Sequence, residues 1–414
     1  MADPVTLALV LGGSIIVIGF LSNYLFERTG FPDMLIIIIL GLLLGPITGL
    51  VDAGSIVSLA PYLAALTLVF ILFDGGMAMN IYHVFSESPR ATVLAIAGFA
   101  MSVFATTLFM SFIVIPTMPM LYSVLFGTIF GGSSSVAIIS LASRIKVSEK
   151  CSTILSLESA ITDILCIVFS LVVIEIILKG ASVDLTAIGQ SIASRFSTGV
   201  VLGVIFGIIW LSVLKRIAKA SYAYMLTLAV VLLVYAFSEF LGGSGPLCSL
   251  LFGIMLGNEK EIYRILRMER PPDSAVDVGL KRFESEIAFL LRTFFFVYIG
   301  LIVTFSNISV VVRGVILSLI LLLVRFGAVR FATIRSNELV KERPIMAVML
   351  TRGLAAAVLA TLPLQYTDVV KYPEAGPIFL VLSPIYIDLA VIIILVTAII
   401  ATIGIPLLKR KAEK

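Results

Sequence analysis

The sequence has 414 residues, of which 60% are hydrophobic and only 13% are charged. This composition excludes a water-soluble globular domain and indicates a membrane protein with many spans. The net charge of +4 does not indicate nucleic-acid binding, because the basic residues occur in short loops between apolar stretches. The single histidine, His83, argues against a histidine-ligated metal or haem site. We therefore expect no cofactor, no nucleic-acid partner and no enzymatic activity.

Apolar stretches along the chain predict an all-α polytopic protein with about 13 transmembrane helices. We expect these helices near residues 5–26, 33–50, 57–80, 91–114, 120–143, 152–178, 186–213, 221–241, 245–257, 283–305, 309–332, 343–365 and 376–407. With the N-terminus outside and the C-terminus in the cytoplasm, most of the 29 Lys and Arg residues lie in cytoplasmic loops. The connection 258–282 mixes both charges and contains two prolines, which predicts a cytoplasmic linker.

The two halves of the chain resemble each other. Gly41-Leu-Leu-Leu-Gly45-Pro46 is echoed by Gly253-Ile-Met-Leu-Gly257-Asn258, 212 residues later (253 − 41). Small residues interrupt helix 120–143 at 131–135, and Thr351-Arg352-Gly353 interrupts helix 343–365 about 221 residues later (352 − 131). Seven helices separate the equivalent segments, so the second copy has inverted topology. Paired interrupted helices in inverted repeats are typical of secondary transporters, although small residues also serve ordinary helix packing.

Two carboxylates, Glu158 and Asp163, lie within the apolar helix 152–178. Acids inside a membrane point into protein or water and mark functional sites. Five helical residues correspond to a rotation of roughly 140° and a rise of about 7.5 Å, so the two acids cannot serve one point. Ser159 shares a face with Asp163, and Thr162 adds a second hydroxyl nearby. Asp163 is therefore the acid in a hydroxyl-rich environment.

Several motifs in this order resemble the monovalent cation/proton antiporters of the NhaP and sodium/proton exchanger type. The motifs are Phe73-Asp74-Gly75-Gly76, Glu158-Ser159-Ala-Ile-Thr162-Asp163, Phe294-Phe-Phe-Val-Tyr-Ile-Gly300, Arg325 and Arg352-Gly353. The resemblance covers nearly the whole chain. It implies an NhaA-like antiporter fold with two crossing discontinuous helices, usually in a homodimer in the plasma membrane of a prokaryote. It also implies a core subdomain, about 57–178 and 283–365, and a dimerisation subdomain, about 1–50, 186–257 and 376–407.

The resemblance also implies roles for individual residues. Asp163 is expected to bind either the cation or a proton, with Ser159 and Thr162 around it and Asp74 helping to hold the cation. Glu158 and Arg352 are expected to form a buried ion pair. From their positions in or near apolar helices, we expect Arg292 and Arg325 to neutralise acids or to extend their charged ends to the membrane surface rather than to touch the substrate.

The helix break departs from many NhaP-type proteins, which have Thr-Asp-Pro where this chain has Ser133, Ser134 and Ser135. We expect Na⁺ as the favoured cation, but the serines resemble the potassium/proton branch of the superfamily, so a K⁺/H⁺ antiporter is the alternative. Hydroxyl and backbone oxygens at the break suit a hard monovalent cation.

Exchange can be derived from the chemistry of Asp163 alone. Burial favours the protonated, neutral acid, whereas a bound cation favours the carboxylate, so proton and cation compete for one group. One exchangeable charge predicts electroneutral one-for-one exchange by alternating access. A passive cation channel is the main alternative, although repeated carbonyl-rich filter loops are absent from the sequence. An intramembrane aspartyl protease is disfavoured because no Gly-x-Gly-Asp stretch occurs.

Overall fold

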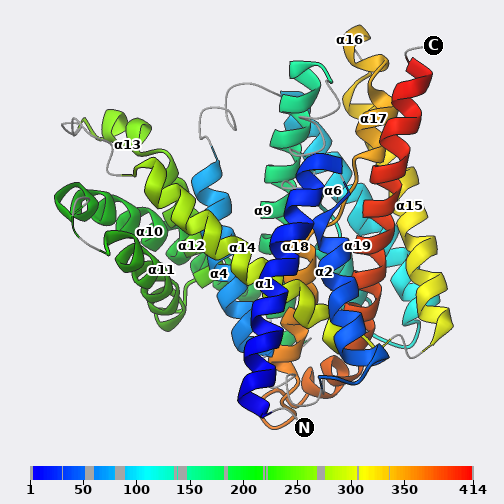
Figure 1. Ribbon diagram of the computed structural model, residues 1–414, viewed down its shortest axis with the longest axis horizontal. Coiled ribbons are helices and arrows are strands. Elements are labelled where there is room, and N and C mark those ends of the chain that lie inside the picture. The colour runs from blue at the N-terminus through cyan, green and yellow to red at the C-terminus, as the bar shows by residue number, and fades with distance from the viewer. Residues whose placement is uncertain are drawn as a thin grey trace. The chain divides into compact units, whose positions relative to one another are not determined.

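A computed structural model describes residues 3–29, 31–51, 60–79, 89–134, 138, 147–180, 185–217, 220, 222–267, 276–304, 307–334 and 336–412 (Figure 1). The regular elements in these ranges are helices. Eight of the described helical segments are long and apolar enough to cross a membrane. They are Leu9–Thr29, Pro89–Val114, Lys150–Lys179, Ala193–Ile217, Ala223–Phe240, Val278–Ile302, Ile308–Ala332 and Gly376–Leu408.

Shorter apolar helices occur where the sequence predicts the other spans. The described ones are Asp33–Ile47, Tyr62–Ala78, Met120–Ile129, Gly245–Gly257 and Leu354–Tyr366. The all-helical membrane fold is therefore confirmed, while the number of helices that cross the bilayer stays a prediction.

The chain divides into two compact units. One unit, here called unit 1, comprises Met1–Pro61, Ser88–Gly180 and Thr293–Lys414, and unit 2 comprises Tyr62–Glu87 and Ala181–Arg292. The predicted core and dimerisation subdomains concern which helices move together. That division stays a prediction.

Unit 1 is built from helices with mostly apolar, buried faces. Its helices are α1 (Pro4–Thr29), α2 (Asp33–Leu42) with its π-helical extension η1 (Leu43–Ile47), α6 (Pro89–Phe109) with η2 (Met110–Val114), α7 (Met120–Ile129), α9 (Glu149–Lys179), the end of α14 (Val278–Ile302), α15 (Ile308–Ala332), α16 (Asn337–Val340), α17 (Arg343–Val348), α18 (Leu354–Thr361), η3 (Leu362–Tyr366) and α19 (Gly376–Ala412). Helix α15 packs against α6, α17 and α19, and α18 packs against α7, α9 and α19 (Figure 1). Helices α7 and α18, which are both short, thus pack against α9.

Unit 2 contains α4 (Ala60–Ala78, from Tyr62 onward), α10 (Leu185–Ile217), α11 (Ala223–Phe240), α12 (Gly245–Gly257), α13 (Glu259–Ile265) and the first part of α14. Helix α12 packs against α10 and α11. Phe73 on α4 stacks beside Phe252 on α12, with ring centroids 5.6 Å apart, in a shared apolar cluster.

The repeat seen in the sequence has a counterpart in the backbone packing. In unit 1, α2 approaches α14 so closely that a Cβ on Gly41 would meet the Val297 carbonyl oxygen and the Gly300 Cα. In unit 2, α12 approaches α4 in the same way, and a Cβ on Gly253 would meet the Phe73 carbonyl oxygen. Val297 and Phe73 are 224 residues apart (297 − 73), close to the separation of 212 between the glycines. Equivalent helix pairs therefore cross at equivalent glycines, which supports the inverted repeat.

Candidate functional site

Two interrupted helices cross in unit 1. Helix α7 ends at Ile129 and its chain continues through a non-helical segment, while α17 and α18 are separated by residues 349–353. The backbone N–H of Ser134 donates to the carbonyl of Thr351 at 2.7 Å, which joins the two breaks directly. Gly353 allows this approach, because a Cβ there would lie within 2.6 Å of the Ser134 Cβ. The crossing of discontinuous helices is thus confirmed.

Aromatic side chains fix the position of α7, the helix before the first break. Phe126 and Phe130 lie 4.7 Å apart between ring centroids, and Phe126 meets the edge of Tyr386 on α19. The Tyr386 hydroxyl donates to the Tyr122 carbonyl of α7. These buried rings pack α7 against α19, so the end of α7 is positioned by the core and not by the loop that follows it.

Helix α9 passes next to the break that follows α7. The backbone N–H of Ser133 donates to the Thr162 hydroxyl at 3.2 Å, and the Ser133 hydroxyl donates to Glu158 Oε1 at 3.0 Å. Gly132 lies so close to α9 that a Cβ there would be 2.8 Å from the Thr162 carbonyl oxygen. The break therefore contacts α9 at the segment that contains both acids.

The Glu158 carboxylate is bound by Arg325 and not by Arg352. Arg325 Nη1 and Nη2 lie 2.7 and 2.9 Å from the two carboxylate oxygens, and Arg325 Nε donates to the Met346 carbonyl at 3.3 Å. Both side chains are buried. The predicted ion pair between Glu158 and Arg352 is therefore wrong. Glu158 pairs with Arg325 of α15 instead, whose planar guanidinium can donate to both carboxylate oxygens. The expectation that Arg325 neutralises an acid is confirmed.

Arg352 occupies the second break and is also buried. Its backbone N–H donates to Thr397 of α19 at 3.2 Å, and its guanidinium lies within electrostatic reach of Glu158 and Asp163. Among the described residues, its Nε has no hydrogen-bond partner. A cavity of about 10 Å³ between Arg352, Arg325, Glu158 and Ser133 has room for about one water molecule. Arg352 thus lies between the two acids of α9.

The hydroxyls predicted around Asp163 are where the helical spacing places them. Ser159 and Thr162 are fully buried, and each donates to a carbonyl three residues earlier in α9, at 3.0 and 3.1 Å. Asp163 itself is only partly buried. The Thr162 hydroxyl already accepts the Ser133 N–H, whereas the Ser159 hydroxyl oxygen accepts no hydrogen bond from the described residues. Ser135, the third serine of the break, lies outside the described residues, as does His83.

Asp74 lies in unit 2, on α4. The Ser285 hydroxyl of α14 donates to its Oδ1 at 3.1 Å, and Arg292 lies within electrostatic reach. Glu284, the neighbour of Ser285, is buried and near Asp74. Sequence reasoning missed Glu284, because the charged run 281–286 looks like the polar end of a helix.

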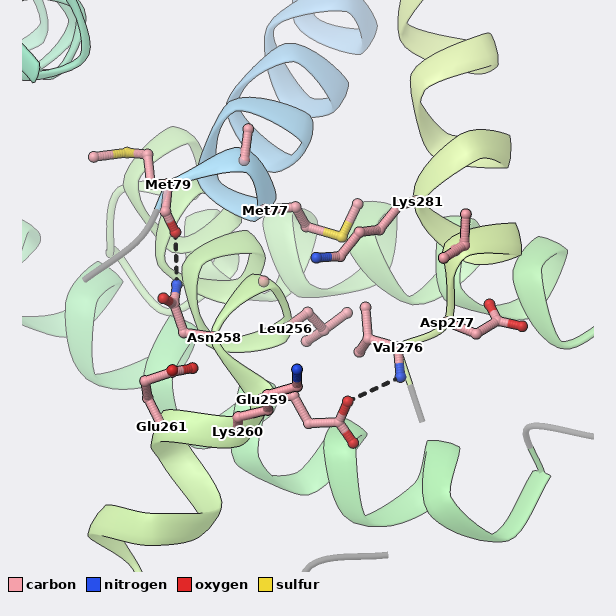
Figure 2. Close-up of a pocket in the computed structure, with 13 residues that line it drawn as sticks. Met77, Met79, Leu256, Asn258, Glu259, Lys260, Glu261, Val276, Asp277 and Lys281 are labelled. Carbon is pink, nitrogen blue, oxygen red and sulfur yellow. Dashed lines mark hydrogen bonds between the residues drawn. The ribbon is translucent and has the colours of Figure 1, made fainter. Parts of the chain in front are cut away.

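A pocket of about 730 Å³ opens at the ends of α4 and α14 in unit 2 (Figure 2). It is lined by Met77 at the end of α4 and by Met79 just after it, and by Asp277 just before α14 and Lys281 in its first turn. The Asn258 side chain donates to the Met79 carbonyl at 2.7 Å and joins this end of α4 to α12 (Figure 2). The lining mixes acidic, basic and apolar side chains.

Two crossing interrupted helices beside a helix with buried acids characterise the inverted-repeat class of secondary transporters. The family model for the transmembrane sodium/hydrogen exchanger matches residues 14–411. The chain belongs to this family.

Similar proteins include the K⁺/H⁺ antiporter NhaP2 of Shewanella oneidensis, 29% identical over 62% of this chain and 45% of that protein. The Na⁺/H⁺ antiporter 1 of Methanocaldococcus jannaschii is 24% identical over 84% of this chain and 81% of that protein. The chain spans less than half the length of the NhaP2 relative. The solved structure of the sodium proton antiporter MjNhaP1 from M. jannaschii at pH 8 has the same fold, with a TM-score of 0.78, 21% identity, and coverage of 98% of this chain and 99% of that one.

Proposed function

We propose that this chain is a transporter that exchanges a monovalent cation, Na⁺ or K⁺, for protons across a membrane. The observation that carries the proposal is the direct bond between the two helix breaks, from Ser134 to Thr351, beside the acid-bearing face of α9. Unwound helices free backbone carbonyls and helix ends, which can receive an ion at the membrane midplane. Membership of the exchanger family and the antiporter relatives support the same activity.

Asp163 is the residue at which cation and proton compete. Glu158 is neutralised by Arg325 and is not available for exchange, whereas Asp163 lies on the partly exposed side of α9. When the cation leaves, the carboxylate takes up a proton, and when a cation returns, the proton is displaced. Each cycle then exchanges one cation for one proton and moves no net charge, provided that the charge of Asp74 stays constant.

The cycle operates by alternating access, with the protein as a homodimer in a prokaryotic plasma membrane. The N-terminus lies outside and the C-terminus in the cytoplasm, in accordance with the distribution of Lys and Arg. The relatives support both cations, since NhaP2 of S. oneidensis is named a K⁺/H⁺ antiporter and the M. jannaschii relative a Na⁺/H⁺ antiporter.

Proton movement in proteoliposomes tests the proposal. Vesicles with a pH-sensitive dye inside receive Na⁺, K⁺ or choline outside, and an exchanger changes the internal pH with one or both metal cations but not with choline. Asp163→Asn is expected to abolish this response while the protein remains folded and inserted. Glu286→Gln is the matched control, because Glu286 is an exposed acid on α14. Cation flux without proton movement would identify a channel, and full exchange by Asp163→Asn would refute the role of Asp163.

A further inference from the structure

Glu284 on α14 is a buried acid without a hydrogen-bond partner. The residue is 1% exposed, and neither carboxylate oxygen accepts a hydrogen bond from any described residue. A buried carboxylate loses its hydration, and leaving it without compensation costs several kcal/mol or more. An isolated acid of this kind within a membrane helix points to a bound positive charge.

The neighbours of Glu284 supply further oxygen ligands. Asp74 of α4 lies within electrostatic reach of Glu284, and its Oδ1 accepts a hydrogen bond from the Ser285 hydroxyl at 3.1 Å. Asp74 is partly buried and Ser285 is exposed, so this side of the cluster is open while Glu284 lies inside. Two carboxylates and a hydroxyl are the oxygen donors that hard cations prefer.

The charges of the cluster do not balance. Asp74 and Glu284 contribute two negative charges when ionised, and Arg292, two turns further along α14, contributes one positive charge within electrostatic reach of Asp74. Among these three groups one negative charge remains, since Lys281, which lines the adjoining pocket, is exposed to solvent. A single monovalent cation neutralises it, whereas a divalent cation would leave a surplus positive charge in a poorly hydrated place.

The pocket at the polar ends of α4 and α14 lies on the same two helices as the cluster (Figure 2). Ala78 lines the pocket four residues after Asp74, and Lys281 lines it three residues before Glu284. These spacings correspond to about 6 Å and about 4.5 Å along the helix axes, or roughly one turn. A hydrated cation in the pocket is therefore about one helical turn from the cluster.

We propose that Asp74, Ser285 and Glu284 together bind one monovalent cation. The choice of Na⁺ or K⁺ as the ligand rests on the proposed function. The three residues of this site belong to unit 2 and do not include Asp163. Glu284 is the ligand that neither the resemblance nor the sequence motifs indicate.

Cation-dependent thermal stability of the purified full chain tests this site. A ligand that binds only the folded state raises the melting temperature as its concentration rises. Na⁺ or K⁺ is titrated at constant ionic strength, balanced with choline, in the Asp163→Asn background. We expect a remaining stabilisation of about 2–4 °C at saturation, lost in Asp163→Asn/Glu284→Gln and retained in Asp163→Asn/Glu286→Gln. Glu286 is the matched control because its side chain is 63% exposed and pairs with Arg282 on the same helix.

The outcomes separate this site from the proposed function. If Asp163→Asn shows no cation-dependent stabilisation, or if Glu284→Gln leaves it unchanged, the cluster does not bind a cation, and a permanently protonated Glu284 explains its burial. If Asp163→Asn retains exchange in vesicles, the proposed function fails at Asp163 whatever the cluster does. Should Glu284→Gln not fold, Asp163→Asn/Ser285→Ala removes a ligand without changing charge and is expected to weaken the apparent cation affinity.

Discussion

Arg325 on α15 donates two hydrogen bonds to the Glu158 carboxylate on α9, at 2.7 and 2.9 Å, and its Nε holds the Met346 carbonyl of α17. The Ser133 hydroxyl adds a third bond to the same carboxylate. One buried ion pair therefore joins the acid-bearing helix, the break after α7 and the half-helix before the second break.

Removing either partner of this pair should destabilise the protein strongly. Glu158→Gln or Arg325→Gln leaves the other charge buried and alone, which typically costs about 3–5 kcal/mol. The melting temperature in detergent is the measurement, and Glu158→Gln/Arg325→Gln should cost less than the sum of the single variants. Arg330→Gln, at an exposed position of the same helix, is the control and should be nearly neutral. Additive effects would contradict a direct interaction.

The crossing of the two breaks should be sensitive to one added carbon atom. In Gly353→Ala the new Cβ collides with the Ser134 side chain, and overpacking of this kind costs about 1–3 kcal/mol. Ser134→Gly removes the obstacle, so the double variant should recover stability. Gly12→Ala on α1 is the control, since nothing lies near its added Cβ. Failure of Ser134→Gly to rescue Gly353→Ala would contradict the observed crossing.

The repeat predicts that two distant glycines respond alike to substitution. A Cβ on Gly41 or on Gly253 meets a carbonyl oxygen of the helix that it crosses, Val297 or Phe73. Backbone cannot move aside as a flexible side chain can, so both alanine variants should show similarly reduced folded yield and melting temperature. Gly189→Ala on α10 has open space and should behave as the native protein. A large effect at only one of the two glycines would argue against equivalent crossings.

Electroneutral exchange predicts insensitivity to membrane voltage. If only Asp163 changes its charge in the cycle, one proton is exchanged for one cation, and a membrane voltage set with an ion that the protein does not transport should neither drive nor bias transport. Sealed vesicles without a pH gradient provide the measurement. Voltage-driven accumulation of the cation would mean that a second group changes its charge, and Asp74 and Glu284 would be the first residues to substitute.

Much of the fold follows from the sequence because the bilayer restricts the choices. Apolar stretches of sufficient length must be helices there, since helices satisfy every backbone group internally. The interruptions at 131–135 and 351–353 could be recognised because glycine and serine replace apolar residues inside such stretches. The face shared by Ser159 and Asp163 follows from helical period alone.

The tertiary structure decided which charged residues contact one another. Arg325 and Arg352 are both buried arginines in apolar surroundings, and no local spacing tells which of them reaches Glu158; the packing of α15 against α6 and α17 brings Arg325 to it. The encounter of Glu284 with Asp74 joins residues 210 positions apart (284 − 74) through the packing of unit 2. Period and hydropathy are local properties of a chain, whereas ion pairs between helices depend on rotations and crossing points that only the packed structure determines.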